Sequence, residues 1–227
     1  MSTDTHVPPR NSVEPISTRP NLVRWTPTLG LAGFVLAVVV GTLAAPPSYR
    51  TLRDTISVLA AVDNPNGPLM VAGFLALGVG LVVNAGLLWR TLPTWSGRAA
   101  AVLVGIAGVA TAVAGLARVA CNPALAQCQA ALAQPTPTST LVHFRAAMFV
   151  FTPLVIAGFV LVRAVWRTGR RRVAMWGLAT ALLDVVETYL VLNDLTPVTG
   201  LLQRTLLLSL YGLPIAVPLV LTRGRPR

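Results

Sequence analysis

Six apolar stretches of about 20 residues each constrain the fold of this chain more than any other feature. Each is long enough for one helix to cross the roughly 30 Å apolar core of a bilayer. Backbone groups left unpaired in lipid cost several kcal/mol apiece, so a helix is the conformation that such a stretch adopts. The pattern therefore predicts an all-α, polytopic bundle of about six transmembrane helices. The stretches are residues 28–45, 68–89, 99–120, 141–162, 173–192 and 201–221.

The charge of the chain is strongly basic, with eighteen arginines, seven acidic residues and a formal net charge of +11. Such a surplus is one sign of a nucleic-acid-binding protein. Here the arginines lie in short runs between apolar stretches that are too long for a soluble fold, which is typical of cytoplasmic loops. We therefore predict that the chain contacts the lipid bilayer and has no nucleic-acid partner.

Arginine runs also predict the orientation of the bundle. They occur in the N-terminal tail, the second and fourth connections and the C-terminus, and these segments alternate along the chain. Because basic loops stay in the cytoplasm, both termini are predicted there, in a multi-pass protein of the bacterial plasma membrane. The tail, residues 1–24, is rich in Ser, Thr and Pro and is predicted to be disordered. Residues 25–222 form the predicted transmembrane domain, and residues 223–227 a basic cytoplasmic C-terminus.

The first apolar stretch has an alternative interpretation. A basic tail, an apolar core and the sequence Thr42-Leu43-Ala44 are compatible with a signal peptide cleaved before Ala45. The tail is long for a signal peptide, and cleavage would leave the orientation of the other five helices unchanged.

Two cysteines, Cys121 and Cys128, lie together in the third connection, which is predicted to be outside. Thiols are oxidised there, so we predict a disulfide between them. The alternative is a metal site completed by His143, but that set has no nearby carboxylate, and no metal is predicted.

Charged residues inside the spanning stretches are the most informative ones, because each costs about 2.5 to 3.5 kcal/mol at a helix centre unless it is paired or hydrated. Asp184 lies near the middle of the membrane, and Glu187 shares its helix face. At about 1.5 Å per residue, Glu187 and Arg204 lie at depths where they can meet. Two interpretations stay open, namely interhelical ion pairs that fix helix register and an outward-facing polar pocket. The candidate ligand-binding residues are Asp54, Ser57, Arg118, His143, Arg145, Asp184, Glu187 and Arg204.

Three motifs resemble an uncharacterised bacterial and archaeal membrane family, domain of unknown function 998. The segment Arg53-Asp54-Thr55-Ile56-Ser57-Val58-Leu59-Ala60 is similar to the D-x-I-S-x-L-G signature of that family, with Ala60 in place of its final glycine. His143 opens the fourth helix after a long outer loop, and Gly200-Leu201-Leu202-Gln203-Arg204 is similar to the start of the family's last helix. The resemblance, over about residues 28–222, implies six helices and no known activity. It implies that Asp54, Ser57, His143 and Arg204 lie together on the outer side.

Asp54 and Ser57 also have a plainer interpretation. Their spacing is that of an N-cap-like turn, which would begin a short amphipathic segment lying in the outer interface.

The residue inventory excludes several functions. With one histidine outside the tail, the chain cannot hold haem between paired histidines or zinc on three of them. It has no phosphate-binding G-x-x-x-x-G-K-[ST] loop, and we predict no cofactor.

Three functions remain. The main hypothesis is a protein that binds or transports a small molecule or lipid through the polar layer. The alternatives are an accessory or sensing membrane subunit, for which no protein partner can be named, and a membrane-embedded hydrolase using Ser57, His143 and Asp54. No G-x-S-x-G motif surrounds Ser57, so the hydrolase hypothesis depends on its hydroxyl lying within about 6 Å of the His143 ring.

Overall fold

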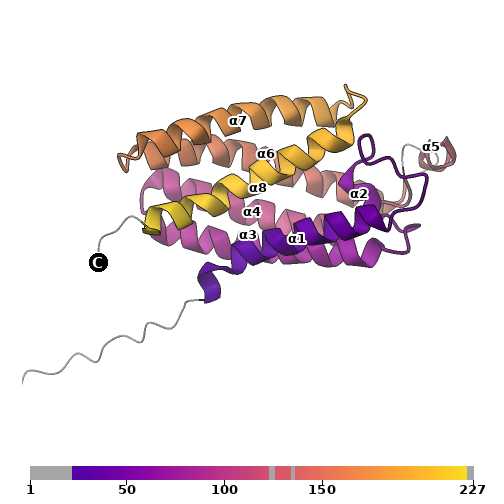
Figure 1. Ribbon diagram of the computed structural model, residues 1–227, viewed down its shortest axis with the longest axis horizontal. Helices are drawn as coiled ribbons and strands as arrows, with labels where there is room; N and C mark the ends of the chain where they lie inside the picture. Colours follow the sequence, from indigo (N-terminus) through magenta and orange to yellow (C-terminus); the bar gives the residue numbers. More distant parts are fainter. Residues whose placement is uncertain (1–21, 123–125, 134–135, 224–227) are drawn as a thin grey trace, which may run out of the picture.

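The computed structural model describes residues 22–122, 126–133 and 136–223. Its long helices run side by side in an all-α bundle (Figure 1). Six helices in the described residues are long and apolar enough to cross a membrane, which confirms the predicted all-α fold with six potential membrane spans. The six are α1 (Thr26–Leu43), α3 (Gly67–Thr91), α4 (Trp95–Leu116), α6 (Thr138–Trp166), α7 (Arg171–Leu192) and α8 (Thr199–Arg223).

Three shorter helices mark the two ends of the bundle. The 3-10 helix η1 (Leu22–Arg24) precedes α1, whereas α2 (Ile56–Leu59) and α5 (Ala126–Ala133) lie at the opposite end (Figure 1). We call these the terminal end and the α2 end. The tail predicted over residues 1–24 lies outside the described residues up to residue 21, as do residues 224–227 of the predicted C-terminus.

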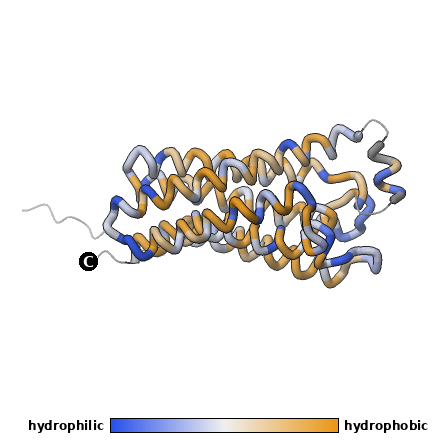
Figure 2. Tube along the Cα trace, turned by 90° about the horizontal axis from the view of Figure 1, so that it is seen from above, coloured by the Kyte–Doolittle hydropathy of each residue, from blue (hydrophilic) through white to orange (hydrophobic). Residues whose placement is uncertain are grey.

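Hydropathy follows the long axis of the bundle. Figure 2 shows mainly hydrophobic residues along the middle of the helices and most of the hydrophilic residues toward the two ends. This distribution fits helices whose middle turns lie in the apolar core of a bilayer.

One close helix contact lies where two glycines face each other. A Cβ atom placed on Gly78 of α3 would lie 2.7 Å from the carbonyl oxygen of Gly108 on α4. A Cβ placed on Gly108 would in turn lie 2.9 Å from the carbonyl oxygen of Gly78. Without side chains at these positions, the backbones of α3 and α4 approach closely, as small residues allow in membrane helices. On its other side α3 packs against α1, and α8 contacts α3, α6 and α7.

The last helix contains two prolines, which the sequence predicts to kink it. Pro218 has no amide hydrogen, so the carbonyl oxygen of Pro214 lacks its usual donor four residues on. The Nδ2 group of Asn84, on α3, donates to that oxygen at 2.9 Å. This bond supplies the donor that the Pro214 carbonyl lacks in the interrupted helix, and it places a polar side chain between α3 and α8.

We expect Gly78→Ala to lower the free energy of unfolding by about 1–3 kcal/mol, because its methyl group would push α3 and α4 apart. Gly86→Ala is the matched control, since a Cβ there meets nothing within 4 Å and alanine is the better helix former. Denaturant titration of both variants in mixed micelles measures the difference. Equal stability of the two variants would contradict close packing at Gly78.

Candidate functional site

The connection between α1 and α3 folds back into the α2 end of the bundle. Its central part, which we call the α2 segment (residues 55–62), contains four consecutive buried residues, Val58, Leu59, Ala60 and Ala61. The predicted amphipathic segment in the outer interface is therefore wrong. Because five of the six residues 56–61 are apolar, burial inside the bundle removes more apolar surface from water than an interfacial position would.

Side chains from other helices satisfy the main-chain groups of the α2 segment. The amide of Ile56 donates to Oε1 of Gln203, on α8, at 2.7 Å. Arg118, directly after α4, donates to the carbonyl oxygens of Ala60 and Ala61 at 2.7 and 2.6 Å. A helix of four residues leaves nearly all its terminal amides and carbonyls without internal partners, so these bonds make its burial possible.

Asp54 braces the turn that precedes α2. Its Oδ2 atom accepts hydrogen bonds from the amide of Arg50 at 2.9 Å and from Nδ2 of Asn122 at 3.1 Å. The N-cap residue of α2 is Thr55, so the predicted N-cap role of Asp54 is wrong. The other oxygen, Oδ1, is buried and has no hydrogen-bond partner among the described residues.

Arg204, on α8, also binds the connection between α1 and α3. Its guanidinium donates to the carbonyl oxygens of Thr51 and Gly200, at 2.8 and 2.6 Å, and to the Tyr49 hydroxyl. Burial raises the pKa of Tyr49, and the neighbouring Arg204 lowers it by less. Arg204 therefore points toward the first connection and not toward Glu187, because equal depth in a bundle does not determine which way a side chain turns.

Ser57 and His143 form the most specific contact of the α2 end. Nε2 of His143 lies 2.9 Å from the Ser57 hydroxyl oxygen, and Nδ1 lies 2.8 and 3.0 Å from the carbonyl oxygens of Ala114 and Ala117. Carbonyl oxygens accept hydrogen bonds and cannot donate them, so Nδ1 carries the ring hydrogen. Nε2 is then an acceptor, and the Ser57 hydroxyl donates to it. The ring is also the cap of α4, whose last carbonyls lack helical donors.

A small cavity of about 40 Å³ adjoins this pair. That volume exceeds the roughly 10–15 Å³ needed for one water molecule. Nε2 of Gln203 has no acceptor among the described residues, so this amide is a free donor beside the cavity. The polar residues that line the cavity are Ser57, Thr111, His143, Gln203 and Tyr211.

The two membrane-embedded acids lie elsewhere. Asp184 accepts a hydrogen bond from the Ser209 hydroxyl, and Oε1 of Glu187 accepts one from Thr205 at 2.9 Å. Both acids are thus buried between α7 and α8, on a different face of α8 from Gln203. Within the described residues, no three His, Cys, Asp or Glu side chains are placed to hold a metal ion.

The structure therefore divides the predicted polar layer. Asp54, Ser57, Arg118, His143 and Arg204 meet around the α2 segment. The acids of α7 do not join them. Arg145 is exposed and lines an apolar groove between α4 and α6.

The predicted disulfide is present. Cys121 and Cys128 are bonded, with their Cα atoms 5.8 Å apart. The bond ties the chain that leaves α4 to α5, beside the Asn122 side chain that reaches Asp54. The disulfide thereby supports the contact between Asn122 and Asp54.

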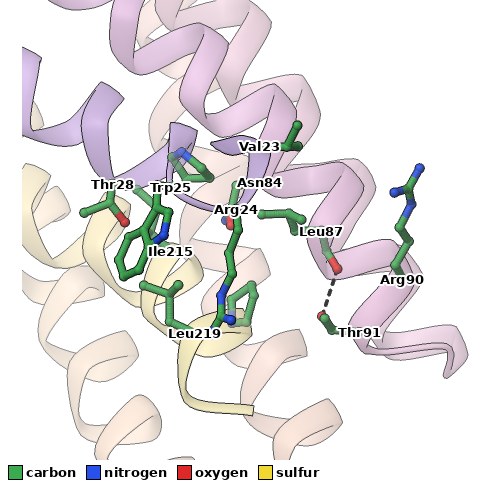
Figure 3. Close-up of a pocket in the computed structure, with 12 residues that line it drawn as sticks. Val23, Arg24, Trp25, Thr28, Asn84, Leu87, Arg90, Thr91, Ile215 and Leu219 are labelled. Atoms are coloured by element: carbon green, nitrogen blue, oxygen red, sulfur yellow. Dashed lines mark hydrogen bonds between the residues drawn. The ribbon is translucent and has the colours of Figure 1, made fainter. Parts of the chain in front are cut away.

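A second cavity, which the sequence did not predict, lies at the terminal end. It has a volume of about 460 Å³ and is bounded by η1, α1, α3 and α8. Figure 3 shows Trp25 and Leu219 on one side of Arg24, with Leu87 and Arg90 on the other. Three separate segments of the chain contribute to it, so no local motif marks the cavity. The one available signal was Asn84, a polar residue inside an apolar stretch.

We expect Arg118 to keep the α2 segment inside the bundle. Val58, 7% exposed, can be replaced by cysteine for maleimide labelling, since no described cysteine of the native chain is free. Adding Arg118→Gln should speed the labelling of Val58→Cys about tenfold or more, because charged hydrogen bonds to two buried carbonyls are lost. Arg145→Gln is the control and should have no effect. Labelling of Val58→Cys as fast as Leu52→Cys, at a 57% exposed position, would show that α2 is not buried.

Comparison with known proteins supports the family resemblance. The model of one protein family, described as "Protein of unknown function (DUF998)", matches residues 28–220. No curated protein and no solved structure matches the chain. The match includes the α2 segment and most or all of each of the six long helices, so this chain belongs to the DUF998 family, whose function is unknown.

Proposed function

We propose that this protein binds a small acyl-bearing molecule, such as a lipid ester, beneath the α2 segment and reacts with it through Ser57. The observation that carries the proposal is the 2.9 Å contact between the Ser57 hydroxyl and Nε2 of His143. The distance is within the range for a nucleophile and its general base. To act as a general base, His143 must not only lie close to Ser57 but also have an unprotonated Nε2 atom facing the hydroxyl.

The hydrogen bonds of His143 supply that tautomer. With Nδ1–H held by Ala114 and Ala117, Nε2 presents its lone pair to Ser57. In a serine protease an aspartate accepts the hydrogen bond from Nδ1–H of the catalytic histidine. Here two main-chain carbonyl oxygens accept it, and they stabilise the imidazolium that forms when the ring takes up a proton.

The chemistry follows from these positions. The Ser57 oxygen attacks the ester carbonyl carbon while its proton moves to Nε2 of His143, and the carbonyl oxygen becomes an oxyanion. Gln203 lines the cavity, and in this proposal its free Nε2 donor stabilises that charge. Collapse of the intermediate breaks the ester bond, and the leaving alcohol takes the proton from Nε2. Water or another alcohol then releases the acyl group from Ser57 by the reverse steps.

Substrate entry requires movement, because a cavity of about 40 Å³ holds water and not an ester. The α2 segment is the element suited to move. It is held by side chains of α6, of α8 and of the chain directly after α4, and it continues none of these helices.

The proposal places the α2 end on the outer side of a bacterial plasma membrane and both termini in the cytoplasm. Arginine runs support this orientation. The described connections at the terminal end and the helix turns that adjoin them contain Arg90, Arg98, Arg163, Arg167 and Arg170–Arg172. The Cys121–Cys128 disulfide supports it as well, since such bonds persist in oxidising compartments.

A second candidate function is ligand binding without chemistry, as in an accessory or sensing subunit. It is favoured by the fact that Ser57, Arg118, His143 and Gln203 all hold the α2 segment in place. Release of that segment would then be the response to a ligand. Transport has less support, because the cavity beside Ser57 and the cavity at the terminal end share no lining residue in the described chain.

We expect a fluorophosphonate ester to label purified protein covalently at Ser57, as shown by intact mass and peptide mapping. Ser57→Ala should abolish the labelling. His143→Asn should slow it by about 10²- to 10⁴-fold, the usual contribution of a general base. Ser209→Ala, which removes a different serine hydroxyl inside the bundle, should label at the wild-type rate.

Thermal unfolding of each variant shows whether it is folded when it is labelled. Folded wild-type protein that stays unlabelled in both detergent and lipid would contradict the nucleophile. If lipid esters then raised the unfolding midpoint of the wild type and not of Ser57→Ala, binding without chemistry would be the function.

A further inference from the structure

The cavity at the terminal end has the size of a small-molecule site. Its volume of about 460 Å³ lies within the roughly 300–1,000 Å³ typical of ligand pockets. It reaches inward as far as Asn84, which lies seven residues before the end of α3, or about 10 Å along the helix. The cavity therefore extends from the level of the arginines at the bundle end into the membrane-spanning part (Figure 3).

The charged groups that line this cavity are all cationic in the part of the chain that the structure describes. Arg24 and Arg90 contribute guanidinium groups, and the described lining residues include no carboxylate. Guanidinium groups bind phosphate oxygens with paired, charge-assisted hydrogen bonds. Arg90 is exposed on the last turn of α3 and adds positive charge at the mouth of the cavity. The electrostatics therefore favour an anion.

The inner part of the cavity needs a hydrogen-bond donor. Asn84 is fully buried, and its amide hydrogens face the carbonyl oxygen of Pro214, which fixes the orientation of the amide group. Its Oδ1 atom then has no partner among the described residues, and the hydroxyl of Thr28 is likewise buried without one. Buried acceptors of this kind are nearly always satisfied in proteins. A ligand hydroxyl that reached Asn84 would satisfy it.

We infer that this cavity binds a phosphoryl group whose substituent carries a free hydroxyl, as in a glycerol phosphate head group. The phosphoryl oxygens contact Arg24 near the bundle end, and the hydroxyl donates to Oδ1 of Asn84 deeper inside. The same chemistry can come from a membrane phospholipid or from a soluble phosphate ester. The site is at the opposite end of the bundle from Ser57 and does not depend on the chemistry proposed there.

The test is the thermal unfolding midpoint of the full chain in phosphatidylcholine-like detergent, with short-chain phosphatidylglycerol, short-chain phosphatidylcholine, glycerol phosphate or inorganic phosphate added. We expect phosphatidylglycerol near saturation to raise the midpoint by about 5 °C or more, and phosphatidylcholine to leave it unchanged. A rise with glycerol phosphate as well identifies a soluble ligand, whereas a rise with the lipid alone identifies a membrane lipid.

Charge-matched variants make the test specific. Arg24→Gln with Arg90→Gln should remove the rise, whereas Arg163→Gln with Arg167→Gln, exposed at the same end and outside the cavity, should keep it. If the first double variant does not fold, Arg90→Gln alone should reduce the rise. Equal rises with phosphatidylcholine, an unchanged rise in the cavity variants, or no rise with any phosphate compound would overturn the inference.

Discussion

Burying a helix of only four residues imposes the constraint on which the α2 end depends. Such a helix satisfies few of its own amides and carbonyls, and each group left unpaired in a low-dielectric interior costs free energy. Here the missing partners come from α8, through Gln203, and from the chain after α4, through Arg118. The α2 segment is therefore hydrogen-bonded by parts of the chain that are far apart in sequence, and it links α8 to the end of α4 at the α2 end of the bundle.

His143 links the structure of the α2 end to the chemistry proposed for Ser57. The two carbonyls that terminate α4 require a donor, and Nδ1 of His143 supplies it. That structural bond leaves Nε2 as an acceptor facing Ser57. Capping a helix and preparing a general base are thus two consequences of one ring orientation. The residues of the family-like motifs, Asp54, Ser57, His143, Gln203 and Arg204, all take part in holding or using the α2 segment.

Much of the fold could be predicted from the sequence, because length and hydropathy determine which stretches can cross a bilayer. The disulfide and the convergence of Asp54, Ser57, His143 and Arg204 were also predicted, the latter through the family resemblance. The burial of α2 was missed, because a short apolar segment looks the same whether it lies on a membrane surface or in a core. The Arg204 partners were missed because depth along a helix does not determine rotation. The terminal-end cavity depends on three separate segments of the chain, so no local pattern contained it.

Hydrogen–deuterium exchange of the protein in lipid nanodiscs tests the central claim, the burial of the α2 segment, most directly. The account predicts that the amides of residues 57–62 exchange as slowly as those in the middle of α3 and α4, and far more slowly than those of residues 47–53. It also predicts that His143→Ala accelerates their exchange while the middle of α3 stays protected. Exchange of residues 57–62 at the rate of the neighbouring connection in the wild type would contradict it.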